Sequence, residues 1–241
     1  MQFFEALIKG ARSALGVAVA CALAGVIVGV VTRTGLGLKL ASALVDIANG
    51  RLLLTMFFAM ITSLILGMGV PTTANYIITS TIAAPALLML GVAALPAHLF
   101  VFYFGIIADL TPPVALAAYA GAAIARANPF KTGVTATRLA VGAFILPYIF
   151  VANPQLLLID ATLLGVVQAA LTAAVGMTAI GAGLAGFLVT RLHWVERLAL
   201  VAAGLLLVDP GLVTDIIGIV VLGGIAAFQV LRRRAVRQKG A

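Results

Sequence analysis

Two short segments of this sequence combine glycine or proline with hydroxyl and amide side chains, and both interrupt apolar runs. The first is Gly67-Met68-Gly69-Val70-Pro71-Thr72-Thr73, with Asn75 just beyond it, and the second is Leu110-Thr111-Pro112-Pro113, which follows Asp109. Carbonyl, hydroxyl and amide oxygens suit a hard cation such as sodium. Where a helix is interrupted in a membrane, the N-terminal end of a half-helix attracts an anion. The two segments are therefore candidates for a cation site beside an anion site.

Each segment also has a purely structural interpretation. Glycine and proline are frequent in membrane helices, and a single such break more often marks a kink packed against a neighbour. Two breaks with hydroxyl groups beside both of them favour a functional site. Asp109 keeps two interpretations, as part of an ion or proton path or as a cap for a half-helix that begins near Val114.

The elements that position these segments must lie in a membrane. The chain has 241 residues, of which 63% are hydrophobic and 9% charged, and its mean hydropathy is +1.23. A soluble domain cannot cover so much apolar surface, so we expect an all-α integral membrane protein. With 1 Cys, the sequence offers no disulfide framework and no zinc spacing.

The net charge of +8 does not indicate a nucleic-acid partner. Five cations follow the last apolar run, where they anchor a helix end on the cytoplasmic side and contact lipid: Arg232, Arg233, Arg234, Arg237 and Lys239. The same rule places the basic connections around Arg126 to Lys131 and Arg191 to Arg197 in the cytoplasm, although Arg33, Lys39 and Arg51 go against the trend. We expect a multi-pass inner-membrane protein with a cytoplasmic C-terminus.

Apolar runs of different lengths predict different elements. Full spans are expected at Ser13–Val31, at Thr132–Val151 and in the long run after Asp160, with a final pair around Asp209-Pro210-Gly211 and an interfacial amphipathic helix over Thr34–Gly50. Leu52–Leu66 is too short to cross comfortably, so we expect it to form a re-entrant hairpin with Ala74–Leu90. Ala97–Asp109 and Val114–Ala125 read as two halves of a helix that opens at the prolines.

Several motifs in this order resemble a known family. They are Leu66-Gly67-Met68-Gly69-Val70-Pro71-Thr72-Thr73-Ala74-Asn75-Tyr76, the stretch from Ala97 to Gly105, the stretch from Ala108 to Tyr119, Lys131-Thr132-Gly133 and Phe150-Val151-Ala152-Asn153-Pro154. Over residues 1–160 they resemble the large membrane subunit of tripartite ATP-independent periplasmic (TRAP) transporters, and more narrowly the fused TAXI-type permeases. Residues 161–241 are similar to the C-terminal membrane extension of some fused members.

The resemblance implies sodium-coupled import of an organic anion, usually a carboxylate, delivered by a periplasmic substrate-binding protein. Sodium is then the coupling ion, and no other cofactor is expected. Because the sequence has one hairpin and one Pro-Pro break where the family's large subunit has two copies of each, it is similar to the C-terminal half of a permease. Its partner would be an N-terminal permease half or a small membrane subunit. The alternative is a truncated or assembly subunit without transport activity of its own.

The same resemblance implies the site residues. The expected cation ligands come from both segments: Gly67, Gly69, Thr72, Thr73, Asn75, Ala108, Thr111 and Pro112. The expected substrate contacts are Thr73, Asn75, Asp109 and Pro113. An intramembrane enzyme is not expected, since the sequence has no His-x-x-x-His or Gly-x-Ser-x-Gly pattern. We expect His98 to be solvated or to cap a helix start, and Tyr103 and Tyr119 to face lipid or a neighbouring helix.

Overall fold

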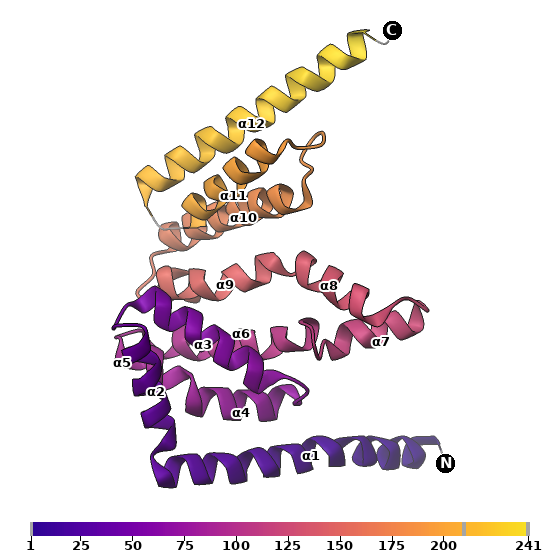
Figure 1. The fold of residues 1–241 in the computed structure, drawn as a ribbon, viewed down its shortest axis with the longest axis vertical. Helices are drawn as coiled ribbons and strands as arrows, with labels where there is room; N and C mark the ends of the chain where they lie inside the picture. The colour runs from indigo at the N-terminus through magenta and orange to yellow at the C-terminus, as the bar shows by residue number, and fades with distance from the viewer. Residues whose placement is uncertain (1, 209–210, 240–241) are drawn as a thin grey trace. The chain divides into compact units, whose positions relative to one another are not determined.

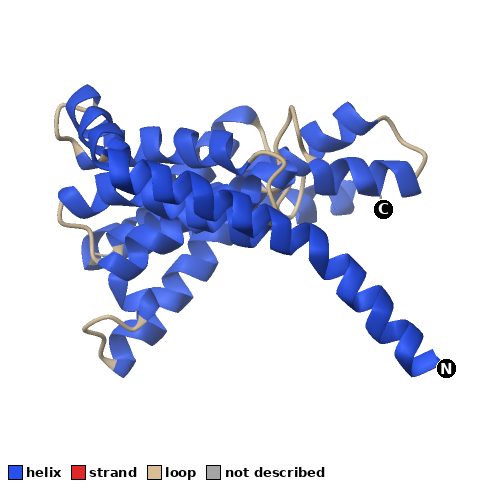
Figure 2. Cartoon of the chain, turned by 90° about the horizontal axis from the view of Figure 1, so that it is seen from below, coloured by secondary structure: helices blue, strands red, loops and turns tan. Residues whose placement is uncertain are grey.

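The chain folds into helices joined by turns. A computed structural model describes residues 2–208 and 211–239, in which one isolated bridge between Phe187 and Arg191 is the only β structure (Figure 2). The expected all-α class is confirmed. Packing divides the chain into two compact units, Met1–Thr137 and Arg138–Ala241. The boundary placed after residue 160 follows the family resemblance and stays a prediction.

A helical hairpin forms the centre of the first unit. Its legs are α3 (Leu52–Gly67) and α4 (Thr72–Ile82), and α6 (Ala94–Ile107) packs against both of them (Figure 1). The turn lies where the sequence predicts it, because Gly67 and Gly69 weaken a helix and Pro71 stands as the N-cap just before α4. Whether this hairpin is re-entrant in a membrane stays a prediction.

The second leg is not the single segment that the sequence predicts. It ends at Ile82 and continues after Ala83 as the short helix α5 (Ala84–Met89). Pro85 has no N–H to bond the carbonyl of Thr81, so the helix cannot run on unbroken. That carbonyl lies against α2 (Leu36–Ile47), where a Cβ added to Gly37 would lie 2.9 Å from the Thr81 oxygen.

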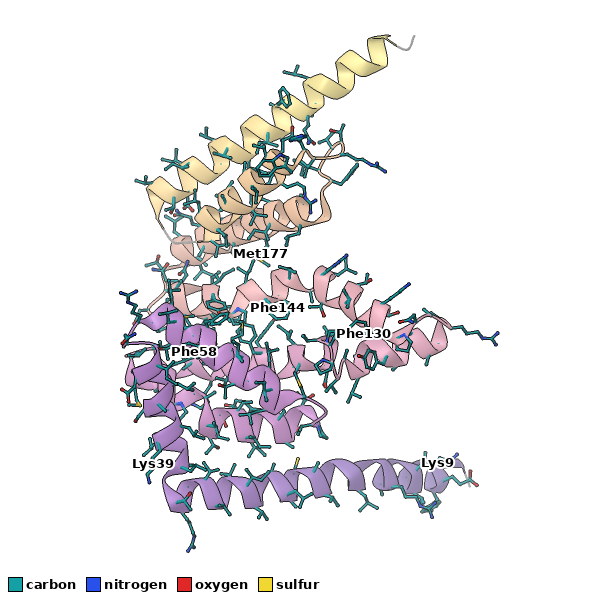
Figure 3. The ribbon with its side chains drawn as sticks, in the orientation of Figure 1. Lys9, Lys39, Phe58, Phe130, Phe144 and Met177 are labelled. Carbon is teal, nitrogen blue, oxygen red and sulfur yellow. The ribbon has the colours of Figure 1, made fainter. Side chains whose placement is uncertain are left out.

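The long helix α1 (Gln2–Thr34) contacts the hairpin with its C-terminal half. Ala24 and Val31 are buried together with Ala74, Ile78 and Ile82 of α4. Between Phe4 and Val19 every α1 side chain that the structure describes is exposed, and Lys9 marks this part in Figure 3. Mostly apolar side chains exposed in this way are expected of a helix surrounded by lipid.

The predicted helix break is present, with shifted boundaries. After α6 comes the single 3-10 turn η1 (Ala108–Leu110), and α7 (Leu116–Ile124) begins only at Leu116 rather than near Val114. Pro112 and Pro113, joined by a cis peptide bond, provide no N–H groups for a helix, and Ala115 has a positive φ of 36°. The chain therefore regains helical geometry two residues later than predicted.

The span predicted over Thr132–Val151 agrees in length and hydropathy with the segment Pro129–Ala152, which is made of two helices. They are α8 (Pro129–Leu139) and α9 (Val141–Ala152), and they meet at Ala140, whose carbonyl accepts a tight bond of 2.8 Å from the N–H of Ala143. An i to i−3 bond of this kind narrows the helix locally and interrupts the regular ladder.

The second unit continues with a short turn and three long helices. These are η2 (Pro154–Leu157), α10 (Leu163–Ala185), α11 (Trp194–Val208) and α12 (Leu212–Lys239). Met177 of α10, labelled in Figure 3, packs against α9: a Cβ added to Gly142 would lie only 2.9 Å from its methyl group. The connection expected at Asp209-Pro210 lies outside the described residues.

Four helical segments of the described chain are long and apolar enough to cross a membrane. They are Phe4–Thr34, Pro129–Ala152, Leu163–Ala185 and Val213–Leu231. The apolar helices Leu52–Gly67 and Ala94–Leu110 are shorter. The lengths agree with a multi-pass membrane protein, whereas the side on which the C-terminus lies stays a prediction.

Candidate functional site

The hairpin turn brings backbone close to α6 because two glycines lack side chains. Gly67 is the last residue of α3 and is buried. A Cβ added to Gly67 would lie 2.5 Å from the carbonyl oxygen of Gly105 in α6 and 2.9 Å from Nδ2 of Asn75. Real Cβ atoms do not approach so closely, so the α3–α6 crossing requires glycine at this position.

Asn75 places its amide at this crossing. The residue is 2% exposed, and a Cβ added to Gly105 would lie 2.6 Å from its Oδ1. That Oδ1 is buried without a hydrogen-bond partner. An unpaired buried acceptor costs about 1–3 kcal/mol, so a ligand that binds this oxygen recovers a cost already present in the fold.

The tip of the hairpin also lies beside the helix break. Gly69 has a φ of +73°, which favours glycine, and a Cβ at this position would lie 3.7 Å from Cγ1 of Val114. The packing of α3 against η1 supports the same placement. The two segments that the sequence singles out are therefore neighbours in space.

Carbonyl groups opened by the break are bonded by side chains of the same unit. The hydroxyl of Thr111 donates to the Ile107 carbonyl at 2.9 Å, and the phenol of Tyr119 donates to the Pro113 carbonyl at 2.8 Å. Thr137 of α8 donates to the Leu110 carbonyl at 3.1 Å. These bonds hold the non-helical backbone in one geometry, as backbone away from water requires.

The first part of α8 covers the break closely. A Cβ on Gly133 would lie 3.2 Å from Cε1 of Tyr119 and 3.3 Å from Cγ of Pro112. Glycine at this position lets α8 approach, and the approach brings Thr137 within reach of Leu110. Tyr119 therefore faces a neighbouring helix, which was one of its expected placements.

Asp109 does not cap α7. The N-cap residue of that helix is Ala115, and no side chain makes a capping bond there. Asp109 lies in η1, and its Oδ1 is buried without a hydrogen-bond partner. Of the two sequence interpretations, capping is wrong, and a role in an ion or substrate path stays a prediction.

The remaining predicted residues occupy the edges of this site. Ala108 is buried in η1 and its carbonyl accepts from the N–H of Thr111 at 3.1 Å. Thr72 and Thr73 form the first turn of α4 with exposed side chains. In the described part of the chain no hydrogen bond joins the hairpin tip to the break, so the structure places the two groups side by side without linking them.

Helix ends of both signs meet at this junction. The C-terminal ends of α3 and α6 lie at Gly67 and Ile107, and the N-terminal ends of α4 and α7 lie at Thr72 and Leu116. A helix carries partial negative charge at its C-terminus and partial positive charge at its N-terminus. One junction therefore presents surroundings for a cation and for an anion.

Sequence reasoning missed residues that shape the site. Gly105 and Thr137 each make a contact across a long stretch of sequence, which no local pattern shows. A small residue within the bulky run Phe102-Tyr103-Phe104-Gly105 was the available signal for Gly105. Of the two roles expected for His98, capping is wrong, because no side chain caps α6. His98 is partly exposed, and its Nδ1 lies 3.1 Å from the Tyr76 hydroxyl of the hairpin.

Comparison with known proteins identifies a family. A family model described as DctM, the Tripartite ATP-independent periplasmic transporter, DctM component, matches residues 1–164, which include the hairpin and the break. No curated protein and no solved structure matches the chain.

Proposed function

The chain belongs to the DctM family of tripartite ATP-independent periplasmic transporters, and we propose that its hairpin and helix break form a sodium site coupled to import of an organic anion. The family makes it a membrane component of a transporter. The observation that carries the finer proposal is Asn75 Oδ1, which is buried without a partner where the hairpin meets α6.

The ligand chemistry of this junction suits sodium. Its binding needs about five or six oxygens, and the neighbouring groups are carbonyl, hydroxyl and amide oxygens. The ligands would be the Asn75 amide, the Thr72, Thr73 and Thr111 hydroxyls, and carbonyls of Gly67, Gly69, Ala108 and Pro112. Since these groups belong to two elements that no hydrogen bond joins, the ion would draw the hairpin tip and the break together.

The anion would bind beside the sodium ion. The N-terminal ends of α4 and α7 begin at Thr72 and Leu116, where free N–H groups favour a carboxylate. Thr73, Asn75, Asp109 and the Pro113 backbone would line that position. A periplasmic binding protein would deliver the substrate, and an N-terminal permease half or a small membrane subunit would complete the transporter.

The test is sodium-dependent uptake by vesicles that contain the complete transporter and its binding protein. Thr73→Val and Thr111→Val remove proposed ligands while nearly conserving volume, so we expect the sodium concentration for half-maximal uptake to rise about tenfold, which is about 1.4 kcal/mol of binding. Thr81→Val is the matched control, because that hydroxyl donates to the Ile77 carbonyl of its own helix at 2.7 Å.

Two outcomes would contradict the proposal. An unchanged half-saturation for sodium in both variants, at normal protein level, places the cation elsewhere. Uptake that does not depend on this chain at all favours the alternative of an assembly subunit without transport activity.

A further inference from the structure

A polar cavity lies in the unit Arg138–Ala241, outside the hairpin and the break. It measures about 180 Å³, which is room for several water molecules. Its polar lining comes from the end of α9, from η2, from the first turns of α10 and from the start of α12, and it consists of Asn153, Gln155, Gln168, Thr172 and Asp215. These helix ends gather on the same side of the unit in Figure 1.

Asp215 is the charged group of this cavity. It is 8% exposed and lies in the first turn of α12. Its Oδ2 accepts from Nε2 of Gln168 at 3.3 Å, whereas Oδ1 is buried without a hydrogen-bond partner. The position near a helix N-terminus stabilises a carboxylate less than burial of a single unpaired charge destabilises it.

The described residues that line the cavity supply no positive charge to balance Asp215. They supply neutral polar groups instead. The Thr172 hydroxyl donates to the Gln168 carbonyl at 3.1 Å, so its oxygen lone pairs stay available to a ligand. Asn153 is only 7% exposed. The cavity therefore offers hydroxyl and amide oxygens, together with amide N–H donors, around one carboxylate.

This chemistry selects the class of ligand. Oxygen ligands favour hard cations, and one carboxylate balances one positive charge, whereas divalent calcium sites usually bring several carboxylates. Within the described residues no three His, Cys, Asp or Glu side chains gather as a transition-metal site would require. We propose that this cavity binds a partly hydrated monovalent metal cation, sodium being the probe ion, with Asp215 as the charged ligand and Thr172 as a neutral one.

If Asp215 only joins two helices, its substitution has a different effect from that expected for a cation ligand. Its bond to Gln168 joins α12 to α10, and an asparagine can keep that bond because its Oδ1 also accepts from an amide. Asp215→Asn therefore removes the charge and preserves the helix contact. A cation site loses its ligand in this variant, and a structural bond does not.

The experiment uses the full chain in detergent with Cys21→Ala and Gln155→Cys, so that one thiol lies at the mouth of the cavity. The rate of labelling by a charged maleimide is measured in sodium chloride and in choline chloride at equal ionic strength. At sodium ten times the Kd, labelling should fall about tenfold relative to choline. Asp215→Asn should abolish this protection, and Thr73→Val at the hairpin should leave it unchanged.

Thr172→Val is a second variant that tests the proposal even if Asp215→Asn does not fold. Thr172→Val should weaken protection several-fold, whereas Thr178→Val, whose hydroxyl donates to the Val175 carbonyl of the same helix at 2.7 Å, should not. Equal labelling in sodium and choline, or full sodium protection in Asp215→Asn or in Thr172→Val, would overturn the proposal. Loss of protection in Thr73→Val alone would assign the effect to the hairpin site.

Discussion

Glycine brings helices together in both units, but the groups it brings together differ. At the α3–α6 crossing, Gly67 and Gly105 face the amide of Asn75. At the α10–α11 crossing, a Cβ on Gly204 would meet Ile180 Cγ1 at 2.5 Å and the Gly176 carbonyl at 2.6 Å. At the first crossing the glycines pack around a polar side chain. At the second, two helix backbones approach each other and the neighbouring side chain is apolar.

Two buried amides, Gln229 and Asn75, differ in the same way. Gln229 of α12 is 0% exposed, and its Oε1 accepts from the N–H groups of Val189 and Thr190 at 3.1 and 3.2 Å. Its Nε2 donates to Oε2 of Glu196 at 3.3 Å. Asn75 has an unpaired Oδ1 instead. A paired buried amide stabilises the fold, whereas an unpaired one is available to a ligand.

Alanine in place of the crossing glycines gives the largest expected effect. Gly204→Ala should lower the free energy of unfolding by about 3 kcal/mol, because the clash is with backbone that moves only if α10 and α11 separate. Gly105→Ala should cost about 1 kcal/mol, since the three nearest atoms all belong to the Asn75 side chain rather than to backbone, yet it should reduce uptake strongly. Unfolding in detergent and vesicle uptake are the measurements.

Matched glycines provide the controls for this comparison. Gly181 of α10 and Gly121 of α7 have nothing within 4 Å of an added Cβ, so alanine there should be neutral or slightly stabilising. Equal stability losses in Gly204→Ala and Gly105→Ala, with uptake falling only as stability falls, would remove the distinction between the two crossings.

A smaller effect is expected where the paired amide is removed. Gln229→Leu should lower the free energy of unfolding by about 2 kcal/mol, because the N–H groups of Val189 and Thr190 lose their acceptor. Asn75→Ala should change stability less and should weaken sodium dependence of uptake. Phe228→Leu, on an exposed position of the same helix as Gln229, is the control. Greater destabilisation by Asn75→Ala than by Gln229→Leu would contradict this interpretation.

The sequence predicts breaks better than it predicts contacts. Gly67, Gly69 and the Pro112-Pro113 pair act on their own backbone, so the turn and the break could be located from local chemistry. Not every local signal was used: the helix end at Ala83, which Pro85 causes, was missed, and so was the αL residue Ala115 that delays α7. Asn75 was predicted as a ligand, but its burial against Gly105 arises from tertiary packing.

The hydrogen bonds of Gln229 and the cavity around Asp215 could not be predicted from the sequence for the same reason. A single glutamine in an apolar run and an aspartate in a first helical turn are ordinary local features. Their partners Val189 and Gln168 are 40 and 47 residues away in the sequence. Periodicity and motif spacing carry no information on which buried polar group meets which, so these sites became visible only in three dimensions.

The smallest expected effect concerns the bond that holds the break against α8. Thr137 and Thr135 both donate to carbonyls of their own helix, at 3.0 Å to Gly133 and 2.9 Å to Lys131, but Thr137 alone of the two also reaches the Leu110 carbonyl. Thr137→Val should therefore loosen the break by about 1 kcal/mol and raise half-saturating sodium by up to about fivefold. Thr135→Val loses only an intrahelical bond and should leave sodium half-saturation unchanged. The measurement is the sodium dependence of uptake for both variants at matched protein level, together with their free energies of unfolding. If the two variants behave alike, the contact between α8 and the break does not tune the site, and the difference between the α3–α6 crossing and the α10–α11 crossing rests on the unpaired amide of Asn75.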